Sequence, residues 1–105
     1  MNFEGGLKKG VFMIGECINC KKIVWPPSEF CNQCFNEIHW REGSNKGKII
    51  EFSKQGDNYF CVVEFENMIK VMGNLLSGIP TLDKQVKIEK CGIKENDYFF
   101  EFSLI

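Results

Sequence analysis

Arginine and histidine are nearly absent from this chain. Among 105 residues, Arg41 is the only arginine and His39 the only histidine, and the formal net charge is −1. Duplex-binding domains are typically strongly basic, and bidentate recognition of phosphate or guanine relies on arginine. The composition therefore argues against a duplex-binding domain. A single histidine is weak evidence for a catalytic triad, so we interpret His39 as a surface side chain beside Trp40.

Long apolar runs are also missing. No segment approaches the roughly 20 apolar residues that span a bilayer, and no window resembles a signal peptide. We therefore expect a cytoplasmic protein. In the reducing cytosol, the six cysteines are expected to be metal ligands and buried thiols rather than disulfides.

The most informative feature present is a pair of Cys-x-x-Cys motifs separated by ten residues, formed by Cys17, Cys20, Cys31 and Cys34. This spacing predicts one tetrahedral Zn²⁺ per chain, held by four thiolates. Four thiolates fill the coordination sphere and leave no position for substrate or water. The predicted zinc is therefore structural, and the alternative is a set of free thiols or a thiol–disulfide centre.

Between the two motifs lies the rigid apolar sequence Trp25-Pro26-Pro27. A small zinc ribbon has little core in which to bury a tryptophan. Two interpretations stay open: the tryptophan packs within the protein against the barrel, or it anchors another protein, since tryptophan is common at interface hot spots.

The remaining sequence predicts a mainly β protein. Phe3, Leu7 and Val11 recur at helical spacing and indicate a short N-terminal helix. We expect a short helix and a zinc ribbon over 1–42 and a five-stranded OB-type barrel over 43–105. Alternating or apolar segments predict the strands, at 11–16 in the ribbon and at 48–54, 59–66, 69–76, 85–91 and 98–104 in the barrel.

Cys61 and Cys91 lie on predicted strands, where free cysteine is commonly buried and inert. An alternative is a thiol-dependent acyl carrier that uses one of them. A second alternative is a single-stranded nucleic-acid binder whose stacking platform is built from aromatic residues, namely Phe52, Tyr59, Phe60, Phe99 and Phe100.

The order of these features resembles the acyl-CoA-associated OB-fold proteins that carry an N-terminal rubredoxin-like zinc ribbon, number thirty-five among the domain-of-unknown-function families. The paired knuckles with Pro26-Pro27 between them are the most specific match. The other matching stretches are Phe3–Gly10, Gly47–Ser53, Val63–Glu66 and Val71–Leu75. Lys21 departs from the family, because a glycine is common at this position after the first knuckle.

The resemblance implies a subunit without chemistry of its own, working beside a thiolase-like enzyme. In archaea such proteins bridge acetoacetyl-CoA thiolase and hydroxymethylglutaryl-CoA synthase at the start of the mevalonate pathway. We therefore expect a non-catalytic scaffold that helps to bind or channel acyl-CoA. Trp25, Pro26 and Pro27 are the candidate contacts to acyl-CoA or to the partner enzyme, and nucleic acid and membrane are not expected partners.

Overall fold

A short helix opens the chain, as the spacing of its apolar residues predicts. In the computed structural model, which describes residues 2–105, helix α1 spans Phe3–Lys8. The Asn2 side chain caps it by accepting a hydrogen bond from a backbone N–H of the first turn at 2.8 Å. Phe3 and Leu7 share the buried face. Val11 lies outside the helix, because a glycine with left-handed backbone geometry follows the last turn.

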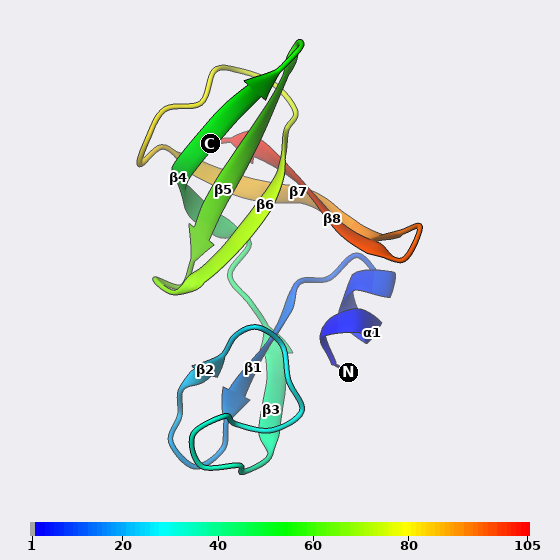
Figure 1. Ribbon diagram of the computed structural model, residues 1–105, viewed down its shortest axis with the longest axis vertical. Coiled ribbons are helices and arrows are strands. Elements are labelled where there is room, and N and C mark those ends of the chain that lie inside the picture. Colours follow the sequence, from blue (N-terminus) through cyan, green and yellow to red (C-terminus); the bar gives the residue numbers. More distant parts are fainter. Residues whose placement is uncertain (1) are drawn as a thin grey trace. The chain divides into compact units, whose positions relative to one another are not determined.

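Three strands form the sheet of the ribbon: β1 (Met13–Cys17), β2 (Ile23–Val24) and β3 (Ile38–Glu42). They lie in the order β2-β1-β3, and both pairings are antiparallel (Figure 1). The predicted strand at 11–16 is therefore present but begins two residues later. Cys17 ends β1, Cys20 lies on the turn between β1 and β2, and Cys31 and Cys34 lie on the loop between β2 and β3.

Five further strands close into a barrel (Figure 1), which confirms the mainly β fold and the five-stranded barrel that the sequence predicts. Their order is β4-β5-β6-β8-β7, and β7 pairs back with β4. The pairings are antiparallel except for the parallel contact of β6 with β8. The strands are β4 (Lys46–Gln55), β5 (Asn58–Phe65), β6 (Ile69–Leu75), β7 (Gln85–Lys94) and β8 (Asp97–Leu104).

The alternating pattern of β5 sets the barrel core. Cys61, Val63 and Phe65 are completely buried, whereas Val62 and Glu64 between them are only partly covered. This is the pattern expected of a strand with one face toward the core. The buried side chains that β4, β6, β7 and β8 add are Ile49, Ile69, Val71, Leu75, Val86, Cys91, Phe100 and Phe102.

The parallel contact of β6 with β8 depends on Gly73. A Cβ atom at this position would lie 2.8 Å from the Phe102 ring and would meet the backbone carbonyl of Phe100 even more closely. Only glycine allows the two backbones to approach in this way. Gly73 therefore holds the barrel closed at the seam between its third and fifth strands.

The chain divides into two compact units, Met1–Gly43 and Ser44–Ile105. The first contains the helix and the ribbon sheet, and the second contains the barrel. Across residues 2–105, none of the helices has both the length and the apolar character that a membrane crossing requires.

Candidate metal centre

The four cysteines lie on two segments, 17–22 and 31–36, that make the same backbone hydrogen bonds. In the first segment, the Lys21 N–H donates to the Cys17 carbonyl at 3.0 Å. In the second, the Phe35 N–H donates to the Cys31 carbonyl at 2.9 Å. Each segment also holds the N–H of its first cysteine, which donates to a carbonyl five residues further on. The sequence therefore folds as two equivalent knuckles, as the repeated Cys-x-x-Cys spacing predicts.

These knuckles bring four sulfur atoms together. The Sγ atoms of Cys17 and Cys34 are 3.3 Å apart, and Cys20 Sγ lies 3.7 Å from Cys31 and 4.0 Å from Cys34. All four atoms lie within 4.8 Å of one another. A tetrahedron with Zn–S bonds of about 2.3 Å has S···S edges of about 3.8 Å. The sulfur set thus fits one structural Zn²⁺, with two buried and two half-buried ligands.

Hydrogen bonds shift the pKa values of the thiols in this cluster. The Asn36 side-chain amide donates to Cys34 Sγ at 3.3 Å, and hydrogen bonds from its side chain and backbone lower the pKa of Cys34 to about 6. The pKa of Cys20 is raised to about 11, mainly by its hydrogen bond with Cys17. Neighbouring thiolates repel one another, so the four thiols do not all lose their protons easily. A divalent cation bound among them favours the thiolate form of each. Asn36 is a supporting residue that the sequence analysis missed, although a polar amide two residues after the last cysteine is a usable signal.

The residue after each knuckle lies in the left-handed region of backbone space. Lys21 has φ of 62° and Phe35 has φ of 59°. Glycine reaches this region without steric cost, whereas other residues pay roughly 1–2 kcal/mol. This geometry explains why glycine is common after the first knuckle in the family that the sequence resembles. Here both positions carry a larger side chain, and Phe35 is 77% exposed.

Residues 5–39 match the family model described as "ChsH2, rubredoxin-like zinc ribbon domain". The matched segment contains both knuckles and the Pro-Pro turn between them. The first unit thus resembles the zinc ribbon of ChsH2 proteins. The match ends before the barrel begins, so it describes one third of the chain, and no curated protein matches the sequence.

Solved structures extend the likeness to the whole chain. The protein described as "Ltp2-ChsH2(DUF35) aldolase" superimposes with a TM-score of 0.78 at 16% identity, over 97% of this chain and 91% of that one. A DUF35-family protein of unknown function from Sulfolobus solfataricus gives a TM-score of 0.70 at 17% identity, over 98% and 82%. At these identities the likeness shows the fold. Together with the ribbon match, it confirms the resemblance to the DUF35 proteins.

In this zinc ribbon, Trp25 packs within its own unit. Its ring meets Phe3 at a centroid distance of 5.5 Å and Phe12 at 6.5 Å, both edge-on. The tryptophan is half-buried, Pro26 is exposed, and the peptide bond between them is cis. The packing partners are thus helix α1 and the segment that follows it. Contact of Trp25, Pro26 and Pro27 with acyl-CoA or a partner remains a prediction.

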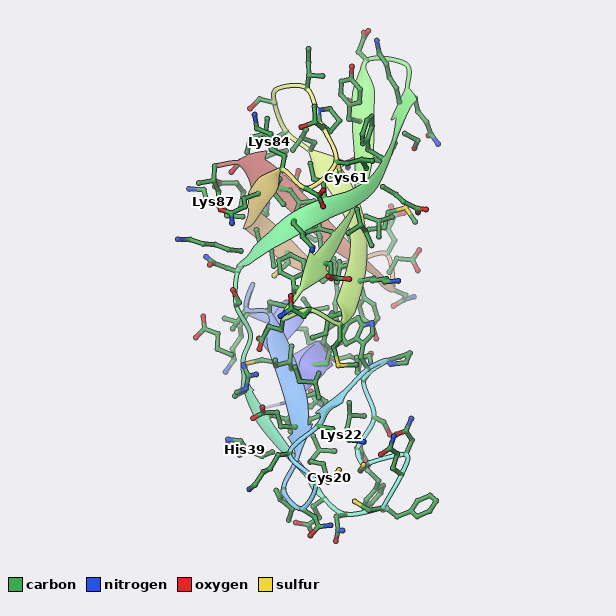
Figure 2. The ribbon with its side chains drawn as sticks, turned by 90° about the vertical axis from the view of Figure 1, so that its left-hand side faces the viewer. Cys20, Lys22, His39, Cys61, Lys84 and Lys87 are labelled. Atoms are coloured by element: carbon green, nitrogen blue, oxygen red, sulfur yellow. The ribbon has the colours of Figure 1, made fainter. Side chains whose placement is uncertain are left out.

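The other candidate groups named from the sequence are one exposed histidine and two buried cysteines. His39 is exposed on β3 (Figure 2) and lies opposite Glu16, whose carboxylate is held by Arg41 at 3.1 Å. Cys61 and Cys91 are buried in the barrel, and burial raises the pKa of both thiols. A raised pKa leaves little thiolate at neutral pH, which is the reactive form.

Proposed function

We propose that this protein is a non-catalytic accessory subunit of an acyl-CoA enzyme complex, with a thiolase-superfamily enzyme as its catalytic partner. One observation carries the proposal: nearly the whole chain shares its fold with the ChsH2-containing aldolase structure, and its first unit matches the ChsH2 ribbon model. Such a subunit would act in the cytoplasm and help to bind or channel acyl-CoA. Thiolase and hydroxymethylglutaryl-CoA synthase of the mevalonate pathway form the specific partner pair that we propose to test first.

The chemistry of the chain supports a role without catalysis. Four thiolates complete the coordination of a structural zinc, so the metal offers no open site for a substrate. The two remaining thiols are buried and disfavour the thiolate form. The reaction is therefore assigned to the partner enzyme, and this subunit contributes surfaces.

Lysines at the β4–β7 seam are the groups that we propose for the phosphates of CoA. Lys46 and Lys87 face each other directly across the two strands, and like charges in this position repel. Lys87 also contacts Glu89 at 3.2 Å, whereas Lys46 has no carboxylate partner within residues 2–105. Lys84 directly precedes β7, and Figure 2 shows Lys84 and Lys87 on the same side of the barrel. A bound anion would relieve this repulsion.

The ribbon apex is the second proposed contact. Because Trp25 is half-buried against aromatic rings, the exposed Pro26 offers the accessible part of this turn. We expect Pro26→Ala to weaken binding of the partner without loss of zinc. Ser28→Ala, at an exposed position two residues away, is the matched control and should leave binding unchanged.

Co-purification from the native cell, followed by mass spectrometry of the stable partners, tests the function. The expected result is an acyl-CoA enzyme of the thiolase superfamily, with CoA binding weakened by Lys46→Gln but unaffected by Lys94→Gln on the far hairpin. A complex without any acyl-CoA enzyme would refute the proposal. Salt-sensitive binding of a single-stranded oligonucleotide would favour the nucleic-acid alternative instead.

A further inference from the structure

Strand β4 pairs with β5 on one side from Lys48 to Gln55. On the other side, β7 pairs with residues 46–48. The next residue, Ile49, donates its N–H to the Lys84 carbonyl at 2.9 Å and accepts from the Asp83 N–H at 2.7 Å. From residue 50 to residue 55, the backbone bonds of β4 within the described chain go to β5 alone. This half of β4 is an open sheet edge, which can pair with another strand.

The turn after β4 identifies the free backbone groups. Gly56, with φ of 62°, and Asp57 form a two-residue hairpin turn, so its flanking residues Gln55 and Asn58 make the closing hydrogen-bonded pair. Hydrogen-bonded and non-hydrogen-bonded pairs alternate in an antiparallel ladder. Lys54 and Phe52 therefore direct their N–H and C=O groups away from β5. These four groups form the free edge.

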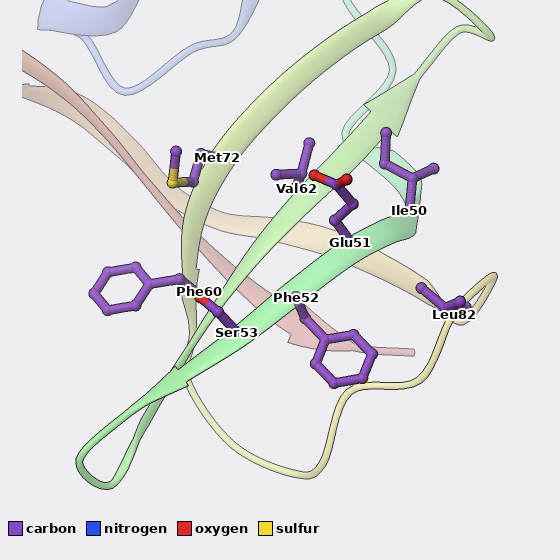
Figure 3. A pocket seen from close by; sticks show the side chains of 8 residues that line it. All are labelled: Ile50, Glu51, Phe52, Ser53, Phe60, Val62, Met72 and Leu82. Atoms are coloured by element: carbon purple, nitrogen blue, oxygen red, sulfur yellow. The ribbon is translucent and has the colours of Figure 1, made fainter.

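An apolar groove follows the same part of the strand. Its volume is about 590 Å³, and four consecutive residues of β4 line it (Figure 3). Neighbouring side chains of a strand point to opposite faces, so a groove that touches four in a row must reach the strand edge. The lining residues are Ile50, Glu51, Phe52, Ser53, Phe60, Val62, Met72 and Leu82. Phe52 is 43% exposed and Leu82, on the loop before β7, is 62% exposed.

The charge of the residues that line the groove indicates which kind of molecule can bind there. Glu51 is the one charged residue among those lining the groove, and it has no ion-pair partner within residues 2–105. The nearby Lys54 lies over the Tyr59 ring, with its Nζ 5.7 Å from the centroid, on the opposite face of the strand. Glu51 is exposed at the wall of the groove, and its negative charge repels the anionic head of an acyl-CoA. The same charge favours an occupant that carries a cation.

We propose that this groove binds an extended segment of a partner protein, which adds a sixth strand beside β4. The backbone of the segment would bond to Phe52 and Lys54, its apolar side chains would contact Phe52 and Leu82, and a lysine or arginine would pair with Glu51. Strand addition of this kind takes its affinity from main-chain bonds and its specificity from alternate side chains. Nothing in this recognition requires the segment to come from an acyl-CoA enzyme.

A short capped peptide of alternating valine and lysine is the probe, and nitrogen-15 amide shifts of the full zinc-loaded chain are the readout. Main-chain recognition tolerates sequence, so we expect saturable, millimolar-range shifts confined to residues 50–55 and Leu82. Lys54→Pro removes an outward N–H and leaves the β5 ladder intact, because proline is accepted at strand edges. This variant should keep its dispersed spectrum and bind at least about tenfold more weakly, since it loses main-chain bonds and gains a steric block.

Charge reversal provides the second arm. Glu51→Lys should weaken binding of the valine–lysine peptide and improve binding of a valine–glutamate peptide, whereas Glu95→Lys on the β7–β8 turn should change neither. Absence of saturable shifts at residues 50–55 would overturn the proposal. So would dimerisation of the free chain that Lys54→Pro abolishes, because a second copy would then be the occupant. Shifts caused by a fatty acyl-CoA and unchanged by Lys54→Pro would assign the groove to an acyl chain.

Discussion

Replacement of Gly73 by alanine gives the sharpest test of the barrel seam. The added methyl group would lie 2.8 Å from the Phe102 Cε2 atom and 2.9 Å from the Phe100 carbonyl carbon. The aromatic ring is buried, and the carbonyl belongs to a strand already held by β7 through the pairing of Cys91 with Phe100. Neither neighbour is the free end of a flexible side chain. Relief therefore requires β6 and β8 to move apart.

Overpacking of a well-packed core typically costs 1–3 kcal/mol. Because backbone atoms supply part of this clash, we expect a loss of about 3 kcal/mol, at the upper end of that range. For a domain of this size, such a loss lowers the melting temperature by roughly 12–24 °C. Far-UV circular dichroism on heating and in urea measures both quantities for the zinc-loaded chain.

The neighbouring residue supplies the control. Asn74 is exposed on the same strand, and Asn74→Ala should change the unfolding free energy by no more than about 0.5 kcal/mol. If Gly73→Ala matched this control, the close approach of β6 and β8 would be refuted. A larger loss with Gly73→Val than with Gly73→Ala would confirm that side-chain volume is the cause.

Three further predictions concern the thiols and the knuckles. Chelation of the metal should remove about one zinc per chain and change the fluorescence of Trp25 and Trp40, both in the ribbon unit, while the near-UV signal of Tyr59 and Tyr98 in the barrel persists. Phe35→Gly should stabilise the zinc-loaded ribbon by about 0.5–1 kcal/mol in urea titrations, because relief of left-handed strain exceeds the added freedom of the unfolded chain; destabilisation would show that the ring is needed. Cys61 and Cys91 should resist alkylation near pH 8, because burial raises their pKa and the thiolate appears only at higher pH. Peptide mass mapping checks this, and rapid labelling of either residue in the native chain would revive the thiol-carrier alternative.

The metal centre was the part of the molecule that the sequence predicted most completely. A Cys-x-x-Cys knuckle is a local structure, so the spacing of Cys17 and Cys20 already specifies its turn. The alternation of Cys61, Val63 and Phe65 likewise predicts the buried face of β5, because side-chain direction in a strand has a period of two. The predicted aromatic platform could not be judged from local pattern, because its members do not share one surface. Phe100 is buried in the core against Phe102, whereas Phe52 is exposed at the groove.

Features that depend on the relative lengths of strands could not be predicted. The sequence indicated a strand over 48–54, but the free edge arises because β4 continues for several residues after its pairing with β7 has ended. The bulge at Ile50 adds an extra residue, which changes the face on which each later side chain of β4 lies. Leu82 joins the groove from a loop about thirty residues away in the chain. Such contacts are set by tertiary structure rather than by local pattern.

The free edge of β4 also gives this protein, which has few reactive groups, a way to act by binding a partner. Exposed edges promote aggregation, and proteins commonly protect them with charged residues or cover them with a partner. The β4 edge carries Glu51 and Lys54, yet its groove displays Phe52, Met72 and Leu82 to solvent. These charges oppose pairing with unrelated strands, whereas the apolar groove stabilises binding of a strand whose side chains complement it. If the edge were merely a tolerated defect, Lys54→Pro would leave every partner interaction unchanged; if it is a docking surface, the same variant should separate partner binding from zinc binding and from folding.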